Sequence, residues 1–66
     1  MNERDMIKEL TLAMEDMFTA VTNGKSYQHE HDKGNKELAM HHHAAMCERV
    51  ARAAKIYNAA NEYLKA

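Results

Sequence analysis

The second half of the chain carries one unbroken helical pattern, and this pattern constrains the fold more than any other feature of the sequence. Its members recur three or four residues apart over roughly seven helical turns of about 3.6 residues each. They are Leu38, His42, Ala45, Met46, Arg49, Ala53, Ile56, Tyr57, Ala60, Tyr63 and Leu64. No proline interrupts the pattern, because the sequence contains none. It predicts a long helix over about residues 36–64, after a turn at 34–35 that Gly34 permits.

The first half of the chain has the same spacing. Its members are Met6, Ile7, Leu10, Ala13, Met14, Met17, Phe18 and Val21. We expect a helix over about residues 3–22, with Asn2 as its N-cap. The segment Thr22-Asn23-Gly24 is typical of a helix stop, because asparagine and glycine tolerate the left-handed conformation. Residues 25–33 then form either a short third helix or, if the stop is overridden, a continuation of the first helix to residue 33.

Continuation of the first helix would give two arms of nearly equal length, folded back about residues 34–35. In that register Gly24 faces Ala45, Met17 faces Ala53, Met14 faces Ile56 and Leu10 faces Ala60. Large side chains would meet small ones, which lets two layers interdigitate. The sequence therefore predicts an all-α fold, a helical hairpin that forms one domain over residues 1–66.

A chain of 66 residues is near the lower size limit for a self-sufficient core. Cys47 is the only cysteine, so no disulfide framework can compensate. Because a lone hairpin buries only one stripe of each helix, we expect it to dimerise into a four-helix bundle. The residues expected at the interface with a second copy or a partner are Met6, Leu10, Met14, Met17, Phe18, His42, Met46, Arg49, Ala53, Ile56, Ala60 and Tyr63.

His42 and Arg49 are polar residues on the apolar stripe of the second helix. A buried arginine must be paired and hydrogen-bonded. One interpretation is a polar dimer seam in which Asp16 or another carboxylate binds Arg49. The alternative is that this part of the stripe stays uncovered and contacts a target protein.

Charge is divided unevenly between the two halves, although the net charge is only −1. Residues 1–22 carry five acidic side chains against two basic ones, and residues 36–66 carry five basic against three acidic. We expect the acidic helix to lie against the basic one. The alternative is a basic face of His41, Arg52 and Lys55 that binds RNA, which the overall charge disfavours.

The sequence is rich in histidine, with five in two groups on either side of the predicted turn. The weak candidates for metal ligands are His29, His31, His43 and Cys47, of which the last two stand at i and i+4. Consecutive helical residues point about 100° apart, so His41, His42 and His43 cannot bind one ion together. We therefore expect no metal and no cofactor, and keep a metal- or pH-responsive histidine element as an alternative.

Nothing in the sequence forms a catalytic motif, and a two-helix scaffold offers no enclosed pocket to Cys47 and a nearby histidine. The charged N-terminal residues and the lack of a long apolar run predict neither a signal peptide nor a membrane span. A lone free cysteine fits a cytoplasmic protein.

The leading hypothesis is a non-enzymatic helical regulator that self-associates and binds a larger protein. Chains of this size and composition are common among phage and mobile-element accessory proteins. An RNA-binding hairpin dimer is the first alternative, and the histidine element is the second.

Overall fold

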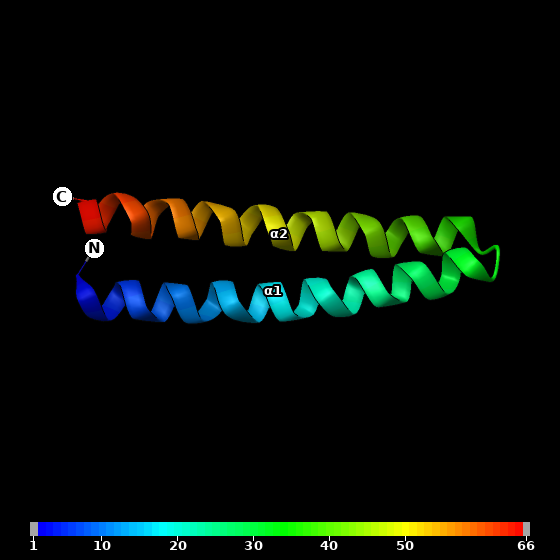
Figure 1. Cartoon of the computed structure of the whole chain (residues 1–66), viewed down its shortest axis with the longest axis horizontal. Coiled ribbons are helices and arrows are strands. Elements are labelled where there is room, and N and C mark those ends of the chain that lie inside the picture. The colour runs from blue at the N-terminus through cyan, green and yellow to red at the C-terminus, as the bar shows by residue number, and fades with distance from the viewer. Residues whose placement is uncertain (1, 66) are drawn as a thin grey trace.

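Two antiparallel helices of equal length make up the structure (Figure 1). In the computed structural model, which describes residues 2–65, α1 spans Glu3–Asp32 and α2 spans Lys36–Lys65, with 30 residues in each. The hairpin measures 48 × 14 × 12 Å, and the two chain ends lie together at the end opposite the turn. The predicted all-α hairpin is confirmed, and the described residues contain no third helix between its arms.

The start of α1 follows the sequence expectation. The side-chain oxygen Oδ1 of Asn2 accepts a hydrogen bond of 2.8 Å from the backbone N–H of Asp5. This bond satisfies one of the amide groups that have no partner in the first helical turn. Glu3 and Asp5 add negative charge there, which the helix dipole favours.

Of the two alternatives for residues 22–33, the structure has the second: the stop expected at residues 22–24 is overridden, and α1 continues through Gly24 to Asp32. Gly24 instead lies against α2, where a Cβ atom added to it would stand 3.4 Å from Sδ of Met46. A glycine inside a helix costs about 1 kcal/mol relative to alanine. We infer that contact with α2 outweighs this local preference and keeps the helix intact.

The turn at Gly34 closes the hairpin with a Schellman motif. The backbone N–H of Gly34 donates to the carbonyl of His31 (3.0 Å), and that of Asn35 donates to the carbonyl of Glu30 (2.9 Å). Gly34 has φ +84°, a conformation that glycine adopts without steric cost. The Asn35 side-chain amide donates to Oε2 of Glu30 (2.7 Å), so it joins the two arms across the turn.

The seam between the helices consists mainly of alanine. Its buried members, which stand three, four, seven or fourteen residues apart along each helix, are Met6, Ala13, Asp16, Ala20, Ala39, Ala53 and Ala60. Small side chains at such positions let two helix backbones approach closely. Among the described residues no large side chain is fully buried, so the hairpin by itself has a very thin core.

The expected register is close to the observed one, but the rotation of α1 about its axis differs. Gly24 lies opposite Met46, one residue from the expected Ala45. Met14, which was expected to face Ile56 inside the hairpin, is 62% exposed, and the two residues line different grooves. That pairing is therefore wrong. The row of alanines on each helix faces the other helix, and the larger side chains of α1 lie on either side of the seam.

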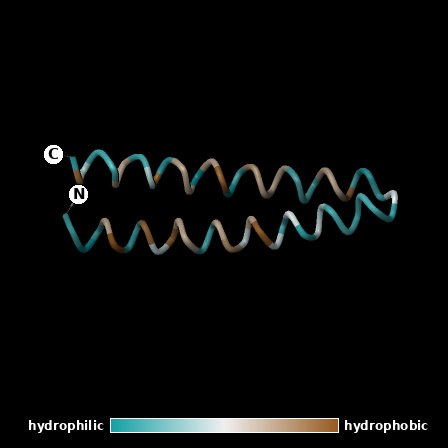
Figure 2. Tube along the Cα trace, viewed as in Figure 1, coloured by the Kyte–Doolittle hydropathy of each residue, from teal (hydrophilic) through white to brown (hydrophobic). Residues whose placement is uncertain are grey.

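Polar residues alternate with apolar ones along both helices (Figure 2). Within residues 2–65, no helix combines the length and the apolar character that crossing a membrane requires.

Candidate protein-interaction face

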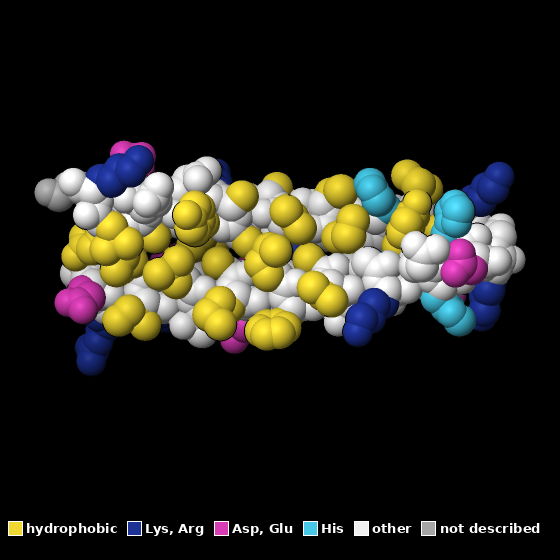
Figure 3. Space-filling model, in the orientation of Figure 1, with side chains coloured by type: hydrophobic (Ala, Val, Ile, Leu, Met, Phe, Trp, Pro, Cys, Tyr) yellow, Lys and Arg dark blue, Asp and Glu magenta, His cyan; other side chains and the backbone are white. Residues whose placement is uncertain are grey.

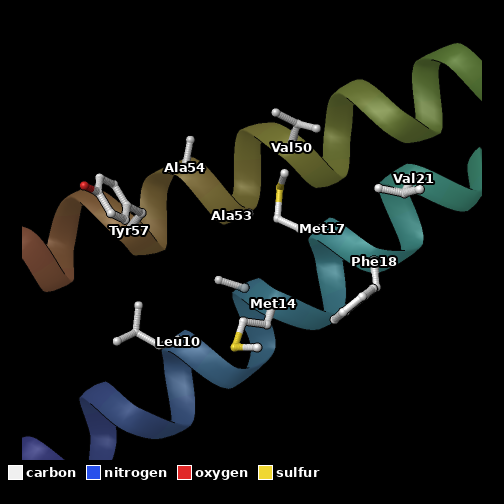
Figure 4. A pocket seen from close by; sticks show the side chains of 10 residues that line it. Leu10, Met14, Met17, Phe18, Val21, Val50, Ala53, Ala54 and Tyr57 are labelled. Carbon is white, nitrogen blue, oxygen red and sulfur yellow. The ribbon is translucent and has the colours of Figure 1, made fainter. Parts of the chain in front are cut away.

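Apolar side chains of both helices gather on one side of the hairpin, mainly in the part away from the turn (Figure 3). A groove of about 720 Å³ runs along it between the helices, and no charged side chain lines this groove. We call its lining the apolar face, which consists of Leu10, Ala13, Met14, Met17, Phe18, Val21, Val50, Ala53, Ala54 and Tyr57. Figure 4 shows Met17 reaching across toward Val50, whereas Phe18 stands at the outer edge of α1.

The large members of the apolar face are unusually accessible. Phe18 is 72% exposed, and Met14 and Tyr57 are each 62% exposed. Ile7 and Leu64 stand two helical turns beyond Met14 and Tyr57, so helical spacing continues the surface toward the chain ends. Large contiguous apolar patches on a protein surface mark sites of contact with a protein or a ligand.

The opposite side of the hairpin has a different chemistry. Its groove, about 590 Å³ in volume, is lined mainly by charged and polar side chains. They are Glu9, Glu15, Asp16, Thr19, Arg49 and Arg52, together with the apolar Leu12 and Ile56. We call this lining the charged face.

A buried carboxylate joins the helices on the charged face. Oδ2 of Asp16 accepts from Nε of Arg52 (2.7 Å), and Oδ1 accepts from Nη2 of the same guanidinium (2.6 Å). Nη1 of Arg49 lies 3.6 Å from Oδ1. The hydrogen bonds from Arg52 lower the pKa of Asp16, and they outweigh burial, which raises it; the charges of both arginines lower it further. This arrangement keeps the carboxylate ionised inside the seam.

Asp16 or another carboxylate was expected to bind Arg49 in a dimer seam, and the structure places Asp16 and Arg49 within one hairpin. Arg52, which was expected on a basic surface, is the closer and bidentate partner of Asp16. Helical spacing could have identified Arg52 as a partner of Asp16. Arg49 and Arg52 stand one turn apart on α2, so both reach the same level of α1. His41 and Lys55, the other members of that expected basic surface, are exposed.

The histidines lie in the half of the hairpin that is nearest the turn. The Tyr27 ring lies 5.7 Å from that of His31 and 5.4 Å from that of His43, measured between centroids. His29 and His31 occupy the last turn of α1. Across residues 2–65, no three histidine, cysteine or carboxylate side chains come close enough together to hold an ion.

Cys47 lies beside His43 on α2, as their i and i+4 spacing predicts. Its sulfur is 3.8 Å from Nδ1 and 3.9 Å from Nε2.

The residues expected at an interface separate into three groups. Met6, Ala53 and Ala60 are buried in or beside the seam, and Met14, Met17 and Phe18 are exposed on the apolar face. The partly exposed or half-buried remainder are Leu10, His42, Met46, Arg49, Ile56 and Tyr63.

Five residues that line the apolar face were missing from the expected interface, namely Ala13, Val21, Val50, Ala54 and Tyr57. Of these, only Val50 and Ala54 were also absent from the two apolar series in the sequence. A signal for Val50 was present, since Val50, Tyr57 and Leu64 stand seven residues apart along one side of α2.

Comparisons of this chain with protein-family models, curated proteins and solved structures gave no match. The chemistry of the two faces is therefore the basis on which a function is inferred.

Proposed function

We propose that this chain is a non-enzymatic interaction protein that self-associates through its apolar face and, as a dimer, binds a larger protein. The observation that supports the proposal is the reversed placement of side chains in the hairpin. Alanines fill the seam, while Met14, Phe18 and Tyr57 remain more than half exposed. A second hairpin on the apolar face would complete the core as a four-helix bundle.

The total exposed surface agrees with this proposal. The hairpin exposes 5173 Å². A compact protein of its mass is expected to expose only about 4300 Å². The excess, roughly 900 Å², is close to the 800 Å² or so that each partner buries in a stable interface. Dimerisation would thus lower the exposed area of each chain to about the value expected for a compact protein of its mass.

The larger partner is assigned to the charged face, which a dimer formed through the apolar face leaves free. Leu12 is 45% exposed there, among the charges around Asp16. An apolar residue with a polar surround is a common arrangement in protein interfaces. We favour a protein over RNA because Asp16 neutralises Arg52 and because the net charge is −1.

Matched substitutions on α1 test self-association. Met17 and Leu12 are 46% and 45% exposed, but Met17 lines the apolar face and Leu12 the charged face. Met17→Glu should raise the dimer dissociation constant at least about a hundredfold, because it places an unpaired carboxylate in the interface. Leu12→Glu should change it less than about threefold, since exposed substitutions have small effects.

Sedimentation equilibrium at micromolar concentration provides the measurement, with circular dichroism to record helix content. We expect the wild-type chain and Leu12→Glu to have twice the chain mass. A wild-type monomer, or equal effects of the two substitutions, would contradict the proposal. In a pull-down from the native host, Leu12→Glu should remain dimeric but lose a protein that the wild-type dimer retains.

A further inference from the structure

We infer that the second copy docks with its turn at the same end of the bundle, so that α1 of each hairpin lies over α2 of the other. The two-fold axis then runs along the length of the bundle. This inference rests on the proposed self-association and specifies its geometry.

A dimer that uses one face twice has a two-fold axis, and two orientations keep neighbouring helices antiparallel. In the same-end orientation, α1 packs on α2 of the second copy. In the opposite-end orientation, α1 packs on α1 and α2 on α2, and the turns point apart. Because helix dipoles are antiparallel in both cases, they do not select one orientation.

Side-chain size favours the same-end orientation. On the apolar face, α1 contributes mainly long or bulky side chains such as Met14, Met17 and Phe18, whereas two of the four residues from α2 are alanines. Packing α1 on α2 places long side chains of α1 over the two alanines of α2 on both sides of the axis. Packing α1 on α1 would press bulky residues together and leave voids between the alanines of α2, both of which destabilise an interface.

The position of the apolar face along the hairpin favours the same orientation. Within one hairpin Asp16 is level with Arg52, and Gly24 is level with Met46. In a same-end dimer whose helix ends are aligned (a flush dimer), residues that are level within one hairpin are also level between the two copies. Met17 then lies near Ala53 and Ala54 of the second copy.

A flush opposite-end dimer pairs residues of α1 whose numbers add to 35, because α1 spans residues 3–32. That arrangement would place Leu10 level with Lys25 and Ile7 level with Gln28. Both pairs set an apolar side chain against a polar one, and Lys25 would lose hydration without gaining a partner.

Distances between spin labels on the two copies test the orientation. Both labelled variants carry Cys47→Ala, which removes the only native cysteine. One adds Ala51→Cys, an exposed position near the middle of α2, and the other adds Lys33→Cys at the turn. Sedimentation of each labelled variant first establishes its mass.

Ala51→Cys is the reference. Because this position is near the middle of the helix, the labels on the two copies lie close to each other in either orientation. With packed helix axes about 10 Å apart, its distance should be at most about 30 Å in any flush dimer. Lys33→Cys discriminates between the orientations. Its labels should also be within about 30 Å in the same-end dimer. In the opposite-end dimer they would be separated by nearly the full 48 Å of the hairpin.

Short distances for both variants would support the inference. A short distance for Ala51→Cys with a long one for Lys33→Cys would overturn the same-end orientation and leave self-association intact. A mass of one chain without any dipolar coupling would overturn both the orientation and the proposed function. A mass above two chains would also overturn the inference, since a closed two-fold pair leaves no apolar face for further copies.

Discussion

The seam and the apolar face of this hairpin divide the side chains by size in the reverse of the usual way. Alanine predominates between the helices, whereas phenylalanine, methionine and tyrosine lie outside on the apolar face. Buried apolar area is the main source of folding free energy, and the seam supplies little of it. The seam therefore sets the spacing and register of the helices, and most of the apolar area that could still be buried lies on the outer surface.

The two surfaces also differ in what limits them. Small alanine side chains occupy most of the seam, whereas the apolar face carries large side chains that have no partner within the hairpin. Substitutions of similar chemistry should therefore have different effects on the two surfaces.

The largest effect is expected from enlarging a seam alanine. Ala53 is 5% exposed, so Ala53→Leu should lower the free energy of unfolding by about 1–3 kcal/mol through overpacking. Ala51→Leu, two residues away on the exposed side of α2, should change it by less than about 0.5 kcal/mol. Urea unfolding at one fixed protein concentration measures both. Equal losses would show that the seam is not close-packed at Ala53.

The ion pair is the polar counterpart of this test. Asp16→Ala should destabilise the hairpin because it leaves two arginines near the seam without their carboxylate. Double-mutant cycles should give a larger coupling free energy for Asp16 with Arg52, which forms two short hydrogen bonds, than with Arg49 at 3.6 Å. Glu15→Gln, an exposed neutralisation next in sequence, is the control. The reverse order of couplings would show that the bidentate geometry does not persist in solution.

The pH dependence of stability follows from the lowered pKa of Asp16. A carboxylate whose pKa is lower in the folded state adds stability above its unfolded pKa, about 3.9 for aspartate. That contribution is lost as pH falls below this value toward the folded pKa. Thermal unfolding followed between pH 7 and pH 2 should therefore show an acid loss that is smaller in Asp16→Asn. The hydrogen bond from Asn35 lowers the pKa of Glu30 in the same direction, so some acid loss should remain in that variant.

The sequence predicted the fold well because its signals are local and repeated. An uninterrupted spacing of three and four residues, the absence of proline and a glycine at residue 34 are sufficient to predict two helices and a turn. The cap at Asn2 could also be predicted, since it depends only on the first helical turn.

The sequence left two features open because they depend on contacts between distant residues. It allowed both a stop at residues 22–24 and a continuation of α1 through Gly24; the structure has the continuation, with Gly24 lying against Met46. The rotation of α1 about its own axis could not be predicted from the sequence. Its small and its large apolar residues form two adjacent rows within one broad apolar stripe. Only close approach of the two backbones selects the row of alanines for the seam, which leaves Met14 and Phe18 outside. The same cause separates the expected interface residues between the seam and the apolar face.

The smallest change in the free energy of unfolding is expected from a substitution at Gly24. Its sign shows how far the close-packed part of the seam extends toward the turn. A Cβ at this position would meet only Sδ of Met46, at the ordinary contact distance of 3.4 Å. Gly24→Ala should therefore raise the free energy of unfolding by up to about 1 kcal/mol, because alanine is the better helix former. Gly34→Ala should instead lower the free energy of unfolding. Because φ is +84° at this position, a residue with a side chain is strained there whatever the space around it. If Gly24→Ala instead destabilises the chain in the same urea titration, the backbones are as close at Gly24 as they are at Ala53, and the close-packed seam extends to Met46.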